Sequence, residues 1–102
     1  MLTEKELNQR NKSDLCAVVR TPQGRRVLWR IFQTVQIEHH GFVPNDAQST
    51  AFHCGQKSIG LFLLNELENA QAGVYAQMRA EYLSELETGQ KEINEQNKES
   101  ML

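Results

Sequence analysis

Proline, cysteine and long apolar runs are all scarce in this chain of 102 residues. The two prolines, Pro22 and Pro44, leave most of the sequence free of residues that interrupt a helix. The two cysteines, Cys16 and Cys54, are too few for a disulfide framework, and we expect free, mostly buried thiols in a reducing cytosol. The densest apolar stretch, 59–67, is far shorter than the roughly 20 residues of a membrane span. We therefore expect a soluble protein with no signal peptide and no membrane-spanning segment.

Strand patterns are also missing, because polar and β-branched residues do not alternate over any useful length. Apolar residues instead recur at helical spacing, which predicts an all-α fold, a compact domain of three to four helices with a polar, acidic C-terminal extension. The expected helices span about 4–19, 22–37, 47–69 and 71–87. The domain would cover 1–88, and 89–102 would form an acidic tail that is disordered alone or becomes helical on assembly.

Capping residues indicate where these helices begin and end. Thr3 is the expected N-cap of the first helix and Thr21 that of the second, where Pro22 suits the first helical position. For the third helix the sequence leaves three candidate caps, Asn45, Asp46 and Ser49. Thr88 followed by Gly89 predicts the end of the fourth helix.

Each helix carries an apolar face that we expect to be buried. In the second helix the expected buried residues are Val27, Leu28, Ile31, Phe32 and Val35, and the opposite side carries Arg26, Arg30 and Gln33. In the third helix the face comprises Phe52, Gly55, Ile59, Phe62, Leu63 and Glu66, and in the fourth it comprises Val74, Tyr75, Met78, Tyr82 and Leu86. Gly55 and Gly60 each cost a helix about 0.5–1 kcal/mol relative to alanine, which indicates close approach of another helix at both positions.

Charge is distributed unevenly along the chain, although the formal net charge is only -2. The segment 20–30 holds four arginines and no acid, whereas 81–102 holds six glutamates and two lysines. A net acidic chain argues against a general nucleic-acid-binding protein. The molecule should therefore have a basic patch near its start and an acidic end.

No group of residues has the spacing of a catalytic, metal or cofactor site. The soft metal ligands His39, His40, His53, Cys16 and Cys54 lack a paired zinc-site spacing. Adjacent His53 and Cys54 diverge on a helix, so one cannot easily act as a base for the other. There is no glycine-rich phosphate loop. We expect a protein that is not an enzyme, with no catalytic, metal-binding or cofactor-binding residues.

The candidate partner-binding residues are Arg25, Arg26, Trp29 and Arg30. Tryptophan and arginine dominate interface energetics, and the guanidinium of Arg25 can lie over the Trp29 indole one helical turn away. Two alternatives stay open. The arginines can pair with the acidic C-terminal helix or face water, or they can contact phosphate while the indole stacks on a base.

The run VRTPQGRRVLWRI at 19–31 is the most distinctive segment of the chain. With TAFHCGQKSIGL at 50–61, then Leu64, Glu66, Tyr75 and Met78, it resembles a family of short tailed-bacteriophage proteins, known from a Bordetella phage and from podovirus and siphovirus genomes. The resemblance covers about 14–81, and its most specific part is 24–29. It implies small helical proteins whose genes tend to lie among head and portal genes, with no enzymatic activity or catalytic residue attached.

The residue pattern and the family resemblance together favour a phage structural or virion-associated protein. It would be an internal, ejected or head–tail accessory component and would act through helix-mediated protein–protein contacts. Its expected partners are phage structural proteins, with a homo-oligomer and, less favoured, nucleic acid as further candidates. We expect it in the host cytoplasm during infection and in the virion. The alternatives are a non-structural regulator that binds a host protein and a DNA-binding packaging accessory.

Overall fold

Four helices and no strand make up the regular structure of the described residues, 1–35, 37–38 and 41–101, in a computed structural model. The helices are α1 (Glu4–Val19), α2 (Pro22–Val35), α3 (Ala47–Ala70) and α4 (Val74–Met101). This confirms the all-α class with three to four helices. The second helix was expected to reach 37, but it ends at Val35, and Gln36 lies outside the described residues.

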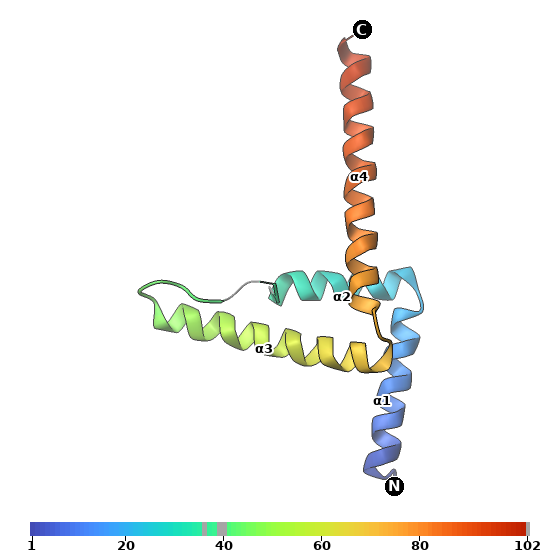
Figure 1. Ribbon diagram of the computed structural model, residues 1–102, viewed down its shortest axis with the longest axis vertical. Coiled ribbons are helices and arrows are strands. Elements are labelled where there is room, and N and C mark those ends of the chain that lie inside the picture. The colour runs from blue at the N-terminus through green and yellow to red at the C-terminus, as the bar shows by residue number, and fades with distance from the viewer. Residues whose placement is uncertain (36, 39–40, 102) are drawn as a thin grey trace.

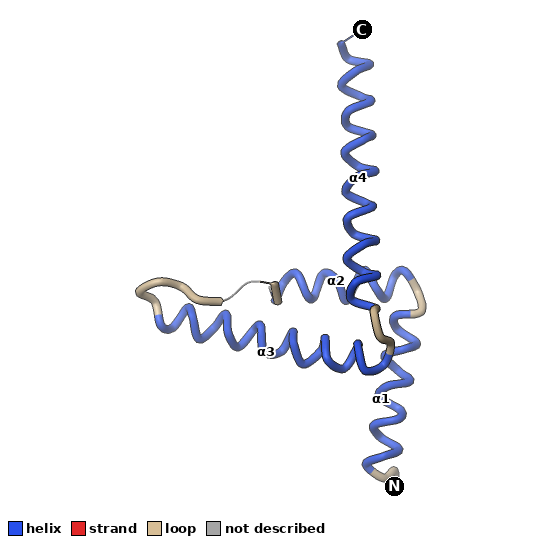
Figure 2. The backbone as a smooth tube through the Cα atoms, in the orientation of Figure 1, coloured by secondary structure: helices blue, strands red, loops and turns tan. Residues whose placement is uncertain are grey.

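The helices form a cross rather than a single bundle (Figures 1 and 2). The helices α2 and α3 run antiparallel side by side, and α1 and α4 leave one end of this pair in opposite directions. The radius of gyration is 18.7 Å, against about 13 Å for a compact chain of 100 residues. Close packing is therefore confined to the junction of the four helices, and the outer halves of α1 and α4 project as arms.

The turn between α1 and α2 is set by Thr21 and Gly24. Thr21 caps α2 as expected, because its hydroxyl accepts a hydrogen bond from the Gly24 backbone N–H at 3.1 Å. A Cβ atom on Gly24 would clash with the backbone carbonyl of Val18 in α1. Glycine at this position allows the last turn of α1 to lie directly against the first turn of α2. At the other end of α1, Thr3 accepts from the Glu6 N–H at 3.2 Å and caps that helix, also as expected.

Helix α3 begins at Ala47 and is capped by Asp46, one of the three candidate caps. The Asp46 carboxylate accepts hydrogen bonds from the Ser49 backbone N–H at 2.9 Å and from the Ser49 hydroxyl at 2.8 Å, and these bonds lower the pKa of Asp46. The expected close helix approach is right for Gly60, where an added Cβ would meet Ile37 and would lie 2.6 Å from Cγ2 of Val35. It is wrong for Gly55 within this chain, because nothing described lies within 4 Å of a Cβ added there.

Helix α4 begins at Val74, and its start is capped by Glu68 of α3. Its two carboxylate oxygens accept from the backbone N–H groups of Gly73 at 2.7 Å and Tyr75 at 3.0 Å. Gly73 has a φ of +84°, a left-handed conformation that glycine adopts without a steric penalty. The carboxylate therefore caps the start of α4 across the turn from α3.

The predicted helix end at Thr88 and Gly89 is wrong, because α4 continues without a break to Met101. Gly89 does not adopt a left-handed conformation, and the Thr88 hydroxyl donates to the Ser84 carbonyl within the helix at 3.1 Å. A glycine in a helix interior costs only about 1 kcal/mol, which does not stop a helix unless the chain also turns. The acidic tail 89–102 is thus helical in the structure as far as Met101.

A single core lies where the four helices meet. Its buried members are Val19, Leu28, Trp29, Phe32, Ile37, Leu67, Val74 and Met78. Several residues that were expected inside are exposed instead, namely Val27 and Ile31 of α2, Phe52, Ile59 and Phe62 of α3, and Leu86 of α4. The buried face of α2 is rotated toward Trp29, and α3 packs through Gly60 and Leu67.

Candidate protein-binding surface

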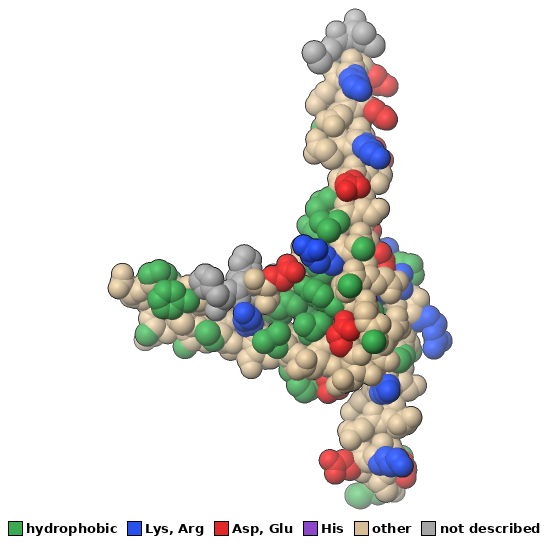
Figure 3. Space-filling view, viewed as in Figure 1, with side chains coloured by type: hydrophobic (Ala, Val, Ile, Leu, Met, Phe, Trp, Pro, Cys, Tyr) green, Lys and Arg blue, Asp and Glu red, His purple; other side chains and the backbone are tan. Residues whose placement is uncertain are grey.

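An open groove of about 510 Å³ lies between α2 and the first half of α4. We refer to it as the α2–α4 groove, and its lining includes Arg25, Arg26, Trp29 and Arg30 of α2 with Glu81 and Tyr82 of α4. Hydrophobic side chains gather around the junction, and charged side chains are prominent on the outer part of α4 (Figure 3). The groove therefore brings together all four of the residues that the sequence singled out. Two of them are largely buried and two are exposed.

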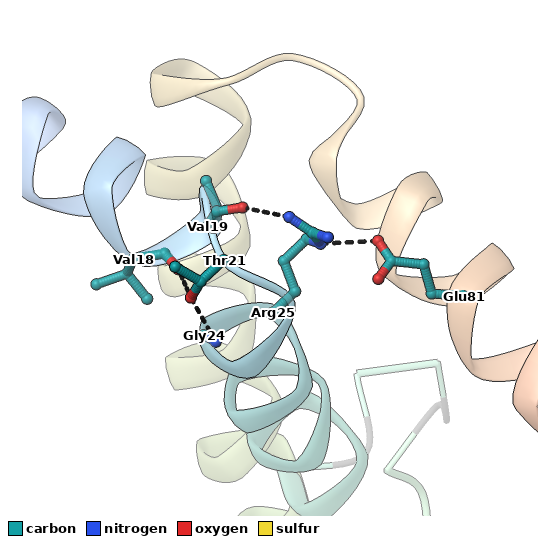
Figure 4. A network of polar contacts seen from close by, with 6 residues as sticks. All are labelled: Val18, Val19, Thr21, Gly24, Arg25 and Glu81. Atoms are coloured by element: carbon teal, nitrogen blue, oxygen red, sulfur yellow. Dashed lines mark hydrogen bonds and ion pairs between the residues drawn. The ribbon is translucent and has the colours of Figure 1, made fainter.

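Arg25 holds the junction together from inside (Figure 4). Its Nε donates to Oε1 of Glu81 in α4 at 2.7 Å, and its Nη1 donates to the backbone carbonyl of Val19 at 2.8 Å. Its side chain is only 14% exposed. The guanidinium thus joins α1, α2 and α4, which is the intramolecular alternative left open by the sequence.

Trp29 is part of the core and not a surface anchor. Only 8% of it is exposed, and its ring centroid lies 5.4 Å from that of Tyr75 and 5.5 Å from that of Tyr82. Its indole Nε1 is buried, and among the described residues it has no hydrogen-bond acceptor. A buried N–H without an acceptor costs about 1–3 kcal/mol.

Arg26 and Arg30 point away from the core and are exposed. Their guanidinium groups form no ion pair within 1–35, 37–38 and 41–101. On the same outer side of α2 lie the exposed aliphatic side chains of Val27 and Ile31, and Val27, Arg30 and Ile31 share a second, shallower hollow of about 380 Å³. We call Arg26, Val27, Arg30 and Ile31 the outer strip of α2.

Two cations next to two aliphatic side chains are typical of a protein contact surface. Arginine is enriched at interface centres, where apolar neighbours exclude water from its hydrogen bonds. The sequence identified the two arginines of the outer strip but placed Val27 and Ile31 in the core. The sequence did not indicate which side of α2 is buried. In the structure Trp29 is on the buried side, and Val27 and Ile31 are therefore exposed.

Tyr75 marks the other side of the junction. Burial raises the pKa of its phenol, and the carboxylate of Glu38 raises it further. Glu38 also lies 3.7 Å from Nε of Arg79, an exposed pair on the surface. This corner of the molecule therefore favours the neutral phenol, which suits its place against Trp29 and Phe32 in the aromatic cluster.

The cysteines and histidines do not assemble into a site in the described part of the chain. The half-buried Cys16 donates its thiol to the carbonyl of Ala70 at 3.3 Å, whereas Cys54 is exposed, contrary to the expectation that both thiols are mostly buried. His53 lies 3.4 Å from the Gln56 side-chain oxygen. No cluster of three His, Cys, Asp or Glu residues suited to a metal occurs among the described residues, and His39 and His40 lie outside them. None of the described helices has the length and apolarity to cross a membrane.

Comparison with known proteins places the chain in a family. A family model described as Bbp19-like phage protein matches residues 15–80, which is 66 of the 102 residues. The chain belongs to the Bbp19-like phage proteins. This matches the resemblance to short tailed-bacteriophage proteins over about 14–81. Neither the curated proteins nor the solved structures that were compared include a match.

The part of the chain shared with the Bbp19-like phage proteins is the junction rather than the arms. Residues 15–80 contain α2 with its outer strip, all of α3 and the first two turns of α4. Most of α1 and the acidic outer part of α4 lie outside the match. In this Bbp19-like protein the family region therefore supplies the core and the exposed faces of α2 and α3, and the arms extend from it.

Proposed function

We propose that this Bbp19-like protein is a structural or virion-associated component of a phage particle, either an internal, ejected or head–tail accessory protein. It acts without catalysis, through contacts between helices, in the host cytoplasm during assembly and then in the virion. Membership of a phage protein family supports the setting. The outer strip of α2 supports the mode of action, because it is an exposed helical face built from the residue types that interfaces use.

The outer strip has the rigidity that a contact surface needs. Arg25 and Trp29 lie on the inner side of the same helix and bind it to α1 and α4. Arg26 and Arg30 are thus presented from a fixed backbone, with Val27 and Ile31 beside them. A rigid scaffold lowers the entropy lost on binding. The partner that fits is a phage protein segment with carboxylates spaced along an otherwise apolar helix face.

The acidic arm provides a second contact of opposite sign. The outer half of α4 carries five glutamates against two lysines between 83 and 101. Among the described side chains, the exposed large apolar residues along this length are Leu83, Leu86 and Ile93. Such an arm suits a basic neighbour and is held clear of the junction, so both surfaces can be engaged together.

Phage particles test the proposal directly. Purified virions should contain the protein at a defined copy number by quantitative mass spectrometry. Phage carrying Arg26→Ala with Arg30→Ala should incorporate less of it, at unchanged protein level in the infected cell. The matched control removes two exposed cations elsewhere, Arg10→Ala with Lys12→Ala, and should incorporate normally.

Three outcomes would contradict the proposal. A protein that is abundant in infected cells and absent from particles, and that captures a host protein, is a regulator. A protein that retards DNA with a strong salt dependence is a packaging accessory. Equal incorporation of the Arg26 and Arg30 variant and of its control would mean that the outer strip is not the contact.

A further inference from the structure

The outward face of α3 is apolar and uncovered. Phe52, Ile59 and Phe62 are 63%, 68% and 65% exposed. Each residue of a helix is turned by about 100° from the last, so these three share one face with Gly55 between them. We call Phe52, Gly55, Ile59 and Phe62 the α3 stripe. Gly60 and Leu67, which pack into the junction, lie on a neighbouring side of α3, about 110° around the helix axis from the centre of the stripe.

Charge is almost absent around the stripe. From Ala47 to Asn65 the only charged residue is Lys57, which is half-buried and lies on another side of the helix. Exposed apolar patches of this size on a soluble chain mark interaction sites. A partner with complementary charge has nothing to pair with here, so the surface that fits is itself apolar and uncharged.

Gly55 gives the stripe a shape. It has open space where a side chain would be, although Gly60, five residues on, is glycine because α2 packs against it. No contact within the described chain explains a helical glycine at 55, which costs about 0.5–1 kcal/mol relative to alanine. The stripe therefore has a ridge of three large side chains and one hole.

The order of ridge and hole is symmetric. Phe52 and Phe62 lie five residues on either side of position 57, and Gly55 and Ile59 lie two residues on either side of it. If a second copy of α3 lies antiparallel to the first with a two-fold axis beside position 57, each Phe52 faces Phe62 of the other copy. Each Ile59 then enters the hole at Gly55 of the other copy. An isologous pair needs this kind of self-complementary surface.

We propose that two copies of this chain form an antiparallel homodimer through the α3 stripe. Taking roughly 200 Å² for a large side chain, the three exposed residues offer about 400 Å² per copy and about 800 Å² in the pair. Homodimer interfaces are about 65% apolar, so an interface of about 1,200 Å², the lower end of the size range for specific complexes, contains about 800 Å² of apolar area. This inference does not depend on the outer strip of α2 or on incorporation into virions.

Gly55→Leu is the sharpest test, because the structure has room for the new side chain and leucine favours a helix. The full-length chain should sediment as a dimer at micromolar concentration. Gly55→Leu should keep its helical circular dichroism and weaken the dimer at least tenfold, since Ile59 loses its hole. If the apolar patch associated without a fixed geometry, the added leucine would strengthen the association. A tighter dimer would therefore overturn the proposal.

Ile59→Gln and Leu61→Gln form a matched pair on the same helix. Ile59 belongs to the stripe, whereas Leu61 is 40% exposed on a different face. Ile59→Gln should raise the dimer dissociation constant by about tenfold or more, and Leu61→Gln should change it less than threefold. A wild-type chain that stays monomeric at 100 µM, or equal effects of the two substitutions, would overturn the proposal.

Disulfide trapping tests the antiparallel register. Ser58 is exposed and lies one residue from the axis, so its two copies are separated by about 3 Å along the helices, whereas the two copies of Cys54 are separated by about 9 Å. Ser58→Cys in a Cys54→Ser background should form an intermolecular disulfide on mild oxidation, and the native chain should not. A disulfide through native Cys54 would indicate a parallel or shifted pair and would overturn the arrangement.

Discussion

Removing Arg25 should destabilise the protein far more than removing its neighbour Arg26. Arg25→Ala deletes a charged hydrogen bond of 2.7 Å to Glu81 and another of 2.8 Å to the Val19 carbonyl. Hydrogen bonds to charged groups contribute about 1.5–3 kcal/mol each, and the 35% exposure of the Glu81 side chain lets water replace part of the loss. We expect a total cost of about 2–3 kcal/mol.

The cost is large enough to measure by thermal unfolding. For a domain of this length 1 kcal/mol moves the Tm by about 4–8 °C, so Arg25→Ala should lower the Tm by about 10–20 °C. Arg26→Ala removes an equally charged side chain that is exposed, and such surface changes stay within about 0.5 kcal/mol. Circular dichroism at 222 nm, at one protein concentration for all variants, gives the comparison.

A double-mutant cycle isolates the contact between α2 and α4. Arg25→Ala and Glu81→Ala should be less than additive by about 1 kcal/mol, because either change alone removes the same bond. Additive effects, or equal Tm values for Arg25→Ala and Arg26→Ala, would refute the assignment of Arg25 as the residue that joins three helices.

Two other residues give predictions of defined sign. Gly60→Ala should lower the free energy of unfolding, measured by urea titration, by about 1–2 kcal/mol. Overpacking against Ile37 costs about 1–3 kcal/mol and outweighs the gain in helix propensity. A higher free energy of unfolding would show that α2 and α3 can move apart freely. The raised pKa of Tyr75 means that its contribution to folding is complete below the unfolded pKa of about 10 and is lost as the pH rises through the folded value. Between pH 9 and 11 the Tm should therefore fall more steeply for the wild type than for Tyr75→Phe, and parallel curves would contradict a raised pKa for this phenol.

Local signals predicted the helices well, because a cap is decided by neighbouring residues. Thr3 and Thr21 occupy the cap positions that the sequence indicated, and the start of α3 is one of three candidates that differ only in which side chain bonds the free N–H groups. The end of α4 was predicted less well. A glycine in sequence looks the same whether the chain turns there or continues, and only its φ decides between them.

Burial could not be predicted from periodicity because α2 is apolar over a wide arc. Val27, Ile31, Leu28 and Phe32 are all consistent with one face, and Trp29 extends that arc on one side. The buried face is centred near Phe32 and extends to Trp29, because two tyrosines of α4 pack against the Trp29 ring. Val27 and Ile31 stay outside on the opposite edge and become part of the candidate site.

The same limitation explains α3. A pattern of apolar residues identifies a face that avoids water but not the partner that covers it, and α3 has two such faces. One of them contacts α2 through Gly60, and the other carries Phe52 and Phe62. For the candidate site, the sequence correctly identified Arg26 and Arg30 as exposed. Arg25 differs from them by its bonds to Val19 and to Glu81, and Glu81 is 56 residues away in the chain.

Helix α4 gives the molecule a lever. It has 28 residues and is therefore about 42 Å long. Its first turns are held by the Glu68 carboxylate on Gly73 and Tyr75 and by the bond between Glu81 and Arg25, which leaves 83–101, about 28 Å, as the free arm. Tilting this arm by about 10° would carry its far end through about 5 Å, which is about one helical pitch.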